Sequence, residues 1–172
     1  LEQVIFANFS HEPAEQLATR LSALTGLERL FFSDNGSTAI EVALKIAWQW
    51  WANQGQPRQQ LIAFDGAYHG DTFGAMALGA RSLFTAPYEP LLFEVRRIDW
   101  PHTHWGDATV EQRELQALSQ LDVALQTPTA AVIFEPLLQG ASGMRLVRPA
   151  FVRSVAERVH AAGALLIADE VM

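Results

Sequence analysis

The sequence predicts an α/β fold in which a mostly parallel sheet is flanked by helices. Segments with apolar residues at helical spacing alternate with short, continuous apolar runs that are typical of buried strands. The 172 residues, 49% hydrophobic and 18% charged, are enough for one folded domain with a sizeable core. Polar residues gather where the predicted strands end, and such sheets bind ligands at that edge. These polar clusters cover residues 33–37, 65–71, 135–140 and 169–171.

The chain first predicts a helix over residues 13–25 and a short strand over residues 27–33. Pro13 suits a first helical turn, and apolar residues recur at helical spacing as far as Leu24. Gly26 then ends the helical pattern. The apolar run that follows is short, as expected of a strand.

A longer predicted helix, residues 37–52, carries two apolar stripes. The first stripe consists of Ile40, Ala43, Leu44, Ala47, Trp48 and Trp51. The second consists of Val42, Ile46 and Trp50. A helix that is apolar on two sides is expected to lie between its sheet and a further partner, and a second subunit is one such partner.

The remaining elements continue the alternation. A break at Gly55 and Pro57 precedes a predicted strand at residues 60–64, and the polar turn 65–72 leads into a short helical turn at 73–78. Further strands are predicted at residues 91–98, 130–134 and 164–168, helices at 110–126 and 150–162, and loops at 81–90, 100–107 and 140–149.

Composition excludes several classes of function. The net charge is −7, from 12 basic and 19 acidic residues, and no basic run appears, which argues against a nucleic-acid partner. There is no cysteine, so neither disulfides nor thiolate chemistry is expected, in keeping with a reducing compartment. No apolar run reaches membrane-spanning length and no signal peptide is visible. We therefore expect a cytoplasmic protein that neither spans nor binds a membrane.

Both ends of the sequence suggest a fragment of a longer protein. The chain opens inside an apolar segment, residues 1–6, with no Met. It stops at Met172, directly after a predicted strand, where an active-site loop is expected to follow in an α/β fold.

The start of the helix at residues 37–52 is the first candidate binding site. Gly36 allows a ligand to approach the backbone closely, and Ser37 and Thr38 offer hydroxyl groups and free N–H groups at the positive end of the helix dipole. Such a helix start binds phosphate readily. The alternative is an ordinary capped helix, since Asp, Asn, Ser and Thr are the common capping residues.

Four motifs in this sequence resemble those of the class III pyridoxal-phosphate (PLP) aminotransferases, in the same order and spacing. They are DNGSTAIE at residues 34–41, YHG at 68–70, EP at 135–136 and DEV at 169–171. The resemblance implies PLP as cofactor, a homodimer, and the PLP-dependent transferase fold type I. Residues 1–172 would then be the central part of the PLP-binding large domain, without the amino-terminal segment, the Schiff-base lysine region or the carboxyl-terminal small domain.

Within that family, residues 68–76, 90–93 and 139–144 look most like the members that act in biotin synthesis. This implies amino transfer from S-adenosylmethionine to 8-amino-7-oxononanoate, giving 7,8-diaminononanoate. Two alternatives remain: another class III aminotransferase acting on an ω-amine or a diamine, and a non-catalytic α/β domain that binds a phosphate-containing ligand.

The resemblance implies a role for five cofactor-binding residues. Gly36 and Ser37 match the family's phosphate cup, and Asp169 matches the aspartate that keeps the pyridine nitrogen protonated. Val171 matches the aliphatic residue beneath the ring, where simple core packing is the alternative. Tyr68 matches the aromatic residue that stacks over the ring, and its hydroxyl is also a candidate for touching substrate.

Three further residues are candidates for the site, and two of them, Asp71 and Glu135, have two interpretations each. Asp71 either presents a carboxylate that favours a cationic amino donor or caps the turn before Phe73. Glu135 either pairs with an arginine or orients substrate. We expect it to position the residues that touch the ligand without touching the ligand itself. His69 is expected to be a hydrogen-bonded structural histidine.

No catalytic residue is assigned within this chain. Lys45 is its only lysine, and it lies mid-helix four residues after Glu41, where a simple ion pair explains it. The family's catalytic lysine follows the DEV motif, beyond Met172, so the chain alone is expected to be inactive. His102 and His104 lack further ligands at suitable spacing and are expected to be loop residues, so no metal site is predicted.

Overall fold

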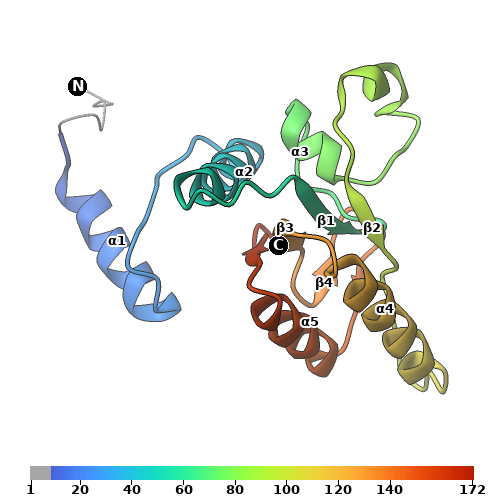
Figure 1. The fold of residues 1–172 in the computed structure, drawn as a ribbon. Helices are drawn as coiled ribbons and strands as arrows, with labels where there is room; N and C mark the ends of the chain where they lie inside the picture. Colours follow the sequence, from blue (N-terminus) through green and yellow to red (C-terminus); the bar gives the residue numbers. More distant parts are fainter. Residues whose placement is uncertain (1–8) are drawn as a thin grey trace. The chain divides into compact units, whose positions relative to one another are not determined.

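A computed structural model describes residues 9–172 of the chain. The predicted apolar opening at residues 1–6 lies outside the described residues. The chain divides into two compact units, Leu1–Phe32 and Ser33–Met172 (Figure 1). The first unit contains α1 (Glu12–Thr25), and the second contains the sheet and every other helix of the described chain.

Helix α1 begins and ends where the sequence predicts. The Nδ1 atom of His11 accepts a hydrogen bond from the N–H group of Ala14 at 3.3 Å, and Pro13 occupies the first turn. Gly26 ends the helix with a φ of 72°, a left-handed conformation that favours glycine. The strand predicted at residues 27–33 is wrong, because the structure assigns no strand there. A short apolar run becomes a strand only where a neighbouring strand completes its hydrogen-bond ladder, and the run itself does not reveal that neighbour.

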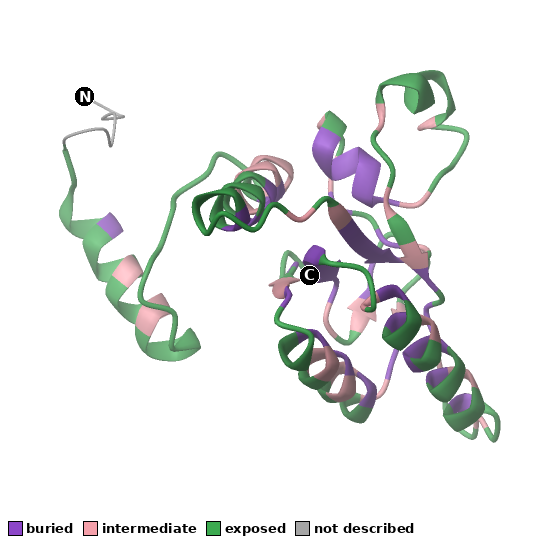
Figure 2. Ribbon diagram, viewed as in Figure 1, coloured by how far each residue is buried: buried purple, intermediate pink, exposed green. Residues whose placement is uncertain are grey.

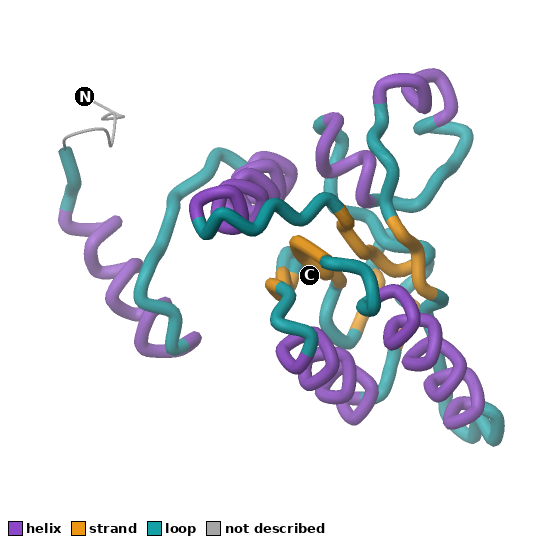
Figure 3. The backbone as a smooth tube through the Cα atoms, viewed as in Figure 1, coloured by secondary structure: helices purple, strands orange, loops and turns teal. Residues whose placement is uncertain are grey.

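The second unit is built on a four-stranded parallel sheet with strand order β2-β1-β3-β6. Its strands are orange in Figure 3. The strands are β1 (Gln60–Phe64), β2 (Arg96–Ile98), β3 (Thr129–Phe134) and β6 (Leu165–Ala168). In the central register, Ile62 lies opposite Val132, which in turn lies opposite Leu166. The predicted mostly parallel sheet is confirmed, and its carboxyl ends define one edge.

Helices cover both faces of this sheet, because successive side chains of a strand point to opposite faces. Leu61 and Ala63 pack under α2 (Gly36–Asn53) and α3 (Phe73–Leu78). Ile62 and Phe64 pack under α4 (Val110–Ala124) and α5 (Pro149–Ala161). Figure 2 shows the buried residues of the second unit concentrated on the strands, on α3 and on one side each of α2, α4 and α5. The unit is therefore a three-layer α/β sandwich.

The core under α4 and α5 is aromatic. The ring of Phe64 meets the ring of Trp100 edge to face, with centroids 5.5 Å apart, and the ring of Phe151 at 6.1 Å. Each such pair contributes roughly 0.5–1.5 kcal/mol beyond the burial of its surface. This cluster anchors β1, whose carboxyl end leads into the polar turn 65–72.

Helix α2 buries most of its first stripe and leaves most of the second exposed. Its buried residues are Ile40, Leu44, Ala47 and Trp51, whereas Trp48 of the first stripe is 49% exposed. The indole N–H of Trp51 donates to the carbonyl oxygen of Ala130 at 2.8 Å, which fixes the helix to β3. Ile46 and Trp50 of the second stripe are half or more exposed. The predicted second subunit on this side therefore stays a prediction.

Three predictions about the connections are corrected by the structure. Only Arg96–Ile98 of the predicted strand 91–98 is a strand, and a 3-10 helix, Ala86–Leu91, begins within the predicted loop 81–90. Pro90, inside that 3-10 helix, has no N–H group to donate to a ladder. The predicted loop 140–149 contains half of a small hairpin, β4 (Leu138–Gln139) with β5 (Arg145–Leu146), whose two-residue strands are too short to show alternation.

Within residues 9–172, none of the helices is both long enough and apolar enough to traverse a lipid bilayer.

Candidate functional site

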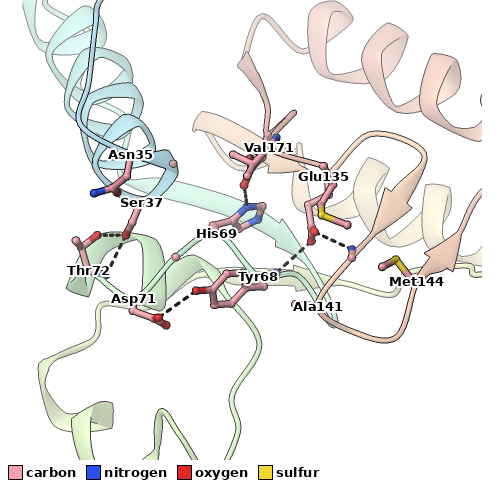
Figure 4. Close-up of a pocket in the computed structure, with 15 residues that line it drawn as sticks. Asn35, Ser37, Tyr68, His69, Asp71, Thr72, Glu135, Ala141, Met144 and Val171 are labelled. Atoms are coloured by element: carbon pink, nitrogen blue, oxygen red, sulfur yellow. Dashed lines mark hydrogen bonds and ion pairs between the residues drawn. The ribbon is translucent and has the colours of Figure 1, made fainter.

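A cavity of about 790 Å³ opens at the carboxyl edge of the sheet (Figure 4). It is lined by the start of α2, by the turns that follow β1, β3 and β6, and by the turn of the small hairpin. The lining residues are Asn35, Gly36, Ser37, Tyr68, His69, Gly70, Asp71, Thr72, Glu135, Gly140, Ala141, Met144, Asp169, Val171 and Met172. The structure thus brings all the predicted cofactor- and substrate-binding residues to one cavity, whose volume suits a small-molecule ligand.

The start of α2 presents an anion-binding end to this cavity. Asn35 caps the helix, because its side-chain oxygen accepts from the N–H group of Thr38 while the Thr38 hydroxyl accepts from the N–H group of Asn35, both at 3.0 Å. The Thr38 hydroxyl is therefore used by the cap and is not available to a ligand, which corrects one expectation. The N–H groups of Gly36 and Ser37, in the first turn, have no intrahelical acceptor.

The hydroxyl of Ser37 is held by the turn after β1. The N–H group of Thr72 donates to Ser37 Oγ at 3.0 Å, and the hydroxyl oxygens of the two residues are 2.8 Å apart. Gly70 makes this approach possible. Its φ is 121°, and a Cβ atom there would lie 2.4 Å from Ser37 Cβ and Oγ.

A buried carboxylate and imidazole form the floor of the cavity. Asp169 follows β6, and its N–H group donates to the carbonyl oxygen of Phe134 at 2.9 Å, which continues the ladder one residue past the strand. Its Oδ2 atom is 2.7 Å from Nδ1 of His69, and both side chains are buried. The pair satisfies a carboxylate that burial would otherwise disfavour. The other nitrogen of the ring, Nε2, is buried without a hydrogen-bond partner among the described residues.

Glu135 joins two of the turns that line the cavity. Its carboxylate accepts from the N–H group of Tyr68 at 3.1 Å and from the N–H group of Gly140 at 3.2 Å. Burial raises the pKa of Glu135, while these two hydrogen bonds act in the opposite direction. Its hydrogen-bond partners among the described residues are backbone N–H groups and not an arginine. Glu135 therefore fixes the position of the Tyr68 backbone.

Tyr68 and Asp71 stand at the exposed side of the cavity. The Tyr68 hydroxyl donates to Asp71 Oδ2 at 3.0 Å, and this hydrogen bond raises the pKa of Tyr68. Asp71 does not cap α3. The N–H groups of Gly74 and Ala75, in the first turn of α3, donate to the carboxylate of Glu41 at 2.7 and 3.2 Å.

Val171 forms an apolar wall beside the helix start. A Cβ atom at Gly36 would lie 2.9 Å from Val171 Cγ2, so only glycine lets the chain after β6 approach α2 this closely. Ala141 and Met144, from the hairpin turn, also line the cavity. Sequence reasoning missed these two residues, because the hairpin that carries them was predicted as a loop.

Lys45 lies outside this cavity. It is exposed on α2, and the carboxylate of Glu41 is directed to α3 rather than to Lys45, so the predicted ion pair between them is wrong. His102 and His104 lie outside the helices and strands of the described chain. Residues 9–172 contain no group of three His, Asp or Glu side chains arranged to hold a metal ion.

The family model for aminotransferase class III matches residues 1–172, the whole chain. The chain belongs to the class III aminotransferases. Within that family it is 61% identical over 175 aligned residues to adenosylmethionine-8-amino-7-oxononanoate aminotransferase of Synechococcus elongatus, and 36% identical over 180 residues to the Geobacter sulfurreducens enzyme of that name. These alignments cover 100% and 99% of this chain but 41% and 40% of those proteins.

Solved structures of the family share the fold. The adenosylmethionine-8-amino-7-oxononanoate aminotransferase of Methanocaldococcus jannaschii superposes with a TM-score of 0.84 at 27% identity, covering 98% of this chain and 37% of that one. A PLP-bound amine transaminase from an uncultivated Pseudomonas species gives 0.85 at 29% identity, covering 98% and 40%. The parallel sheet with flanking helices is therefore that of the PLP-dependent transferases of fold type I. The chain spans about two fifths of the length of the relatives it matches.

Proposed function

We propose that this chain is the central, cofactor-binding part of an enzyme that transfers an amino group from S-adenosylmethionine to 8-amino-7-oxononanoate, the activity for which its Synechococcus relative is named. The observation that carries the proposal is a single cavity lined by an anion-binding helix start and a buried carboxylate, in a chain 61% identical to such an aminotransferase. Residues 1–172 would form most of the centre of the large domain, with the catalytic lysine in the sequence that follows Met172.

The residues of the cavity suit PLP in charge and in shape. The N–H groups of Gly36 and Ser37, together with the Ser37 hydroxyl, would hold its phosphate. Asp169 would face its pyridine nitrogen, and Val171 and Tyr68 would lie against the two faces of its ring. The cavity thus offers positive backbone dipoles for the anionic group, a carboxylate for the cationic nitrogen and apolar surface for the ring.

Bound PLP would supply an electron-accepting ring for the loss of a proton from the amino-bearing carbon of the substrate. Asp169 would hold a proton at the ring nitrogen, and His69 would fix the orientation of the Asp169 carboxylate through the 2.7 Å contact. Glu135 would keep Tyr68 over the cavity through the Tyr68 N–H group. Tyr68 would also exclude water from one side of the ring.

Asp71 would select a cationic amino donor. Its carboxylate is exposed at the cavity and accepts one hydrogen bond, from Tyr68, which leaves acceptor capacity for a sulfonium-bearing amine. In the full-length protein, Asp71→Asn should raise KM for S-adenosylmethionine by about 3- to 30-fold, the range for one exposed to partly buried charge contact. Tyr68→Phe, which removes the hydrogen bond and keeps the charge, is the matched control. Unchanged donor kinetics in Asp71→Asn would argue against this role.

The decisive experiment is an assay of the full-length protein with 8-amino-7-oxononanoate and S-adenosylmethionine, with 7,8-diaminononanoate measured as product. Parallel reactions offer ω-amines and diamines as donors. The second candidate, a class III aminotransferase acting on such amines, is favoured by the likeness to the amine transaminase and to a lysine aminotransferase of M. tuberculosis, at 29% and 28% identity. If S-adenosylmethionine is the only donor that gives 7,8-diaminononanoate, the first candidate is supported. If only ω-amines or diamines serve as donors, the second candidate is supported.

We further propose that the protein is a cytoplasmic homodimer. The exposed second stripe of α2, with Ile46 57% and Trp50 50% exposed, supports a partner on that side. Light scattering of the full-length protein tests this, and Trp50→Glu should shift the protein toward the monomer, whereas Gln49→Glu, on the neighbouring exposed position, should not. Cell fractionation tests the compartment.

A further inference from the structure

We propose that Thr72 is a positioning residue for the cofactor phosphate: its hydroxyl donates to Ser37 and so directs the hydrogen of the Ser37 hydroxyl toward the anion. The inference rests on the proposed function, because it takes the phosphate of PLP to bind at the start of α2. Thr72 is 35 residues from Ser37 in sequence and reaches it only through the fold.

Thr72 contacts Ser37 Oγ through two groups, its backbone N–H group and its hydroxyl. The Thr72 N–H group donates to Ser37 Oγ at 3.0 Å, and Thr72 Oγ1 lies 2.8 Å from the same atom (Figure 4). Both residues line the cavity and both are partly buried. Ser37 is therefore held by the backbone and the side chain of one residue at once.

The Thr72 hydroxyl does not cap α3, although its position at the start of that helix suggests this role. Thr72 is the N-cap residue of α3, yet its side chain makes no capping hydrogen bond. The carboxylate of Glu41, one turn after Ser37 on α2, accepts from the first N–H groups of α3 instead. Helix α2 thus supplies the cap, and the Thr72 hydroxyl is directed at Ser37.

Counting hydrogens gives the direction of the bond when an anion is present. A hydroxyl has one hydrogen to donate and two lone pairs that accept. If the N–H and O–H groups of Thr72 both donate to Ser37 Oγ, both lone pairs are used, and the single hydrogen of Ser37 points away from Thr72. An anion beside the N–H groups of Gly36 and Ser37 stabilises this arrangement, because it accepts that hydrogen.

The neighbouring backbone keeps this geometry from relaxing. A Cβ atom at Gly70 would lie 2.4 Å from Ser37 Oγ and 2.8 Å from Ser37 Cα, so the turn is packed directly against the helix start. At its other end the turn is tied by the N–H group of Tyr68 to Glu135. Thr72 therefore has a fixed position from which to orient Ser37.

The test compares PLP with pyridoxal, which lacks the phosphate, in the full-length protein. Thr72→Val removes the hydroxyl and keeps the size and the N–H group, and dissociation constants are measured by the change in absorbance on binding. Loss of one oriented hydrogen bond should weaken PLP binding by about 3- to 10-fold, with pyridoxal binding unchanged. Thr72→Ser, which restores the hydroxyl, should bind both as the unmodified protein does.

A second comparison isolates the route through Ser37. In a Ser37→Ala background, Thr72→Val should weaken PLP binding no further, because no hydroxyl remains to be oriented. Equal weakening of PLP and pyridoxal by Thr72→Val would assign Thr72 a structural role and overturn the inference, as would no change in either constant. If Thr72→Val does not fold, Thr72→Ala carries the same comparison.

These outcomes separate the inference from the proposed function. If the unmodified protein binds PLP no more tightly than pyridoxal, the phosphate site at Gly36 and Ser37 fails, and the inference fails with it. If the unmodified protein prefers PLP and only the Thr72 variants behave contrary to expectation, the inference fails and the proposed cofactor site stands.

Discussion

Gly70 lies too close to Ser37 to accept a side chain without a shift, and Gly70→Ala tests the close contact between the turn after β1 and helix α2. A Cβ atom at this position would lie 2.4 Å from Ser37 Cβ and Oγ, whereas carbon atoms pack best at about 3.5–4.0 Å. Ser37 Cβ is fixed by the backbone of α2, and Ser37 Cα would lie only 2.8 Å away, so side-chain rotation does not relieve the contact. The turn must move instead, and the contacts of Ser37 with Thr72 must lengthen.

The expected loss of stability has two parts. The backbone φ of 121° is strained for alanine, which costs about 1–3 kcal/mol, and overpacking adds about 1–3 kcal/mol. We therefore expect Gly70→Ala to lower the free energy of unfolding by about 2–6 kcal/mol. Gly106→Ala is the matched control, because Gly106 has a φ of 79° and a Cβ atom there would have no heavy atom within 4 Å. It should lose only the backbone part, about 1–2 kcal/mol.

Urea unfolding of the full-length protein without cofactor measures both variants, since bound ligand would itself stabilise the folded state. PLP binding should also weaken in Gly70→Ala and not in Gly106→Ala, because only Gly70 lies against Ser37. If the two variants lose the same stability within about 0.5 kcal/mol, the close contact does not constrain the turn and the reasoning from Gly70 is refuted.

Three further predictions concern the floor of the cavity, the core and the surface. Asp169→Asn should lower kcat/KM of the full-length enzyme by about 10- to 100-fold, because a neutral amide no longer stabilises a proton on the ring nitrogen or pairs as strongly with His69; steady-state kinetics measure this, and an unchanged kcat/KM contradicts it. Phe151→Ala should lower the free energy of unfolding by about 3–5 kcal/mol, since the ring is 1% exposed; a loss in urea unfolding below about 1 kcal/mol would show that the core closes around the gap. The hydrogen bond from Arg113 holds the pKa of Asp107 well below its usual value, so this pair contributes stability above the usual pKa that is lost as the pH falls. Arg113→Gln should therefore be destabilising near neutral pH and closer to the unmodified protein in acid; thermal unfolding as a function of pH tests this, and a difference that is constant with pH would contradict it.

The sequence alone predicted those elements whose evidence is local. The strand at residues 60–64 and the helical turn at 73–78 were found with their bounds, because turn signals frame a short apolar run in one and a small apolar cluster in the other. The strand-end rule then predicted that polar residues from distant motifs meet at one edge. Glu135 and Asp169, which directly follow β3 and β6, do line the same cavity, as parallel strands require. Ser37 lines it from the start of α2, because the strand predicted before it does not form.

The wrong and the missed strand predictions show what local sequence patterns do not determine. Residues 27–33 contain a short apolar run, as residues 130–134 do, but only the second run finds neighbouring strands on both sides. Whether a run is paired depends on residues far away in sequence, so its own composition does not decide. The hairpin that brings Met144 to the cavity escaped prediction for the opposite reason, because its strands are too short to carry a pattern.

Sequence therefore determined the family, the order of the layers and the edge at which ligand-binding residues gather, because each follows from motifs and periodicities that neighbouring residues carry. Only the tertiary structure decided the partners of the polar side chains. Glu41 bonds the start of α3 although Lys45 lies one turn away, and His69 reaches Asp169 across 100 residues. The first N–H groups of α3 have no acceptor within their own helix, and the fold brings them to the Glu41 carboxylate. The spacing of Glu41 and Lys45 along α2 does not reveal that these N–H groups compete with Lys45 for the carboxylate.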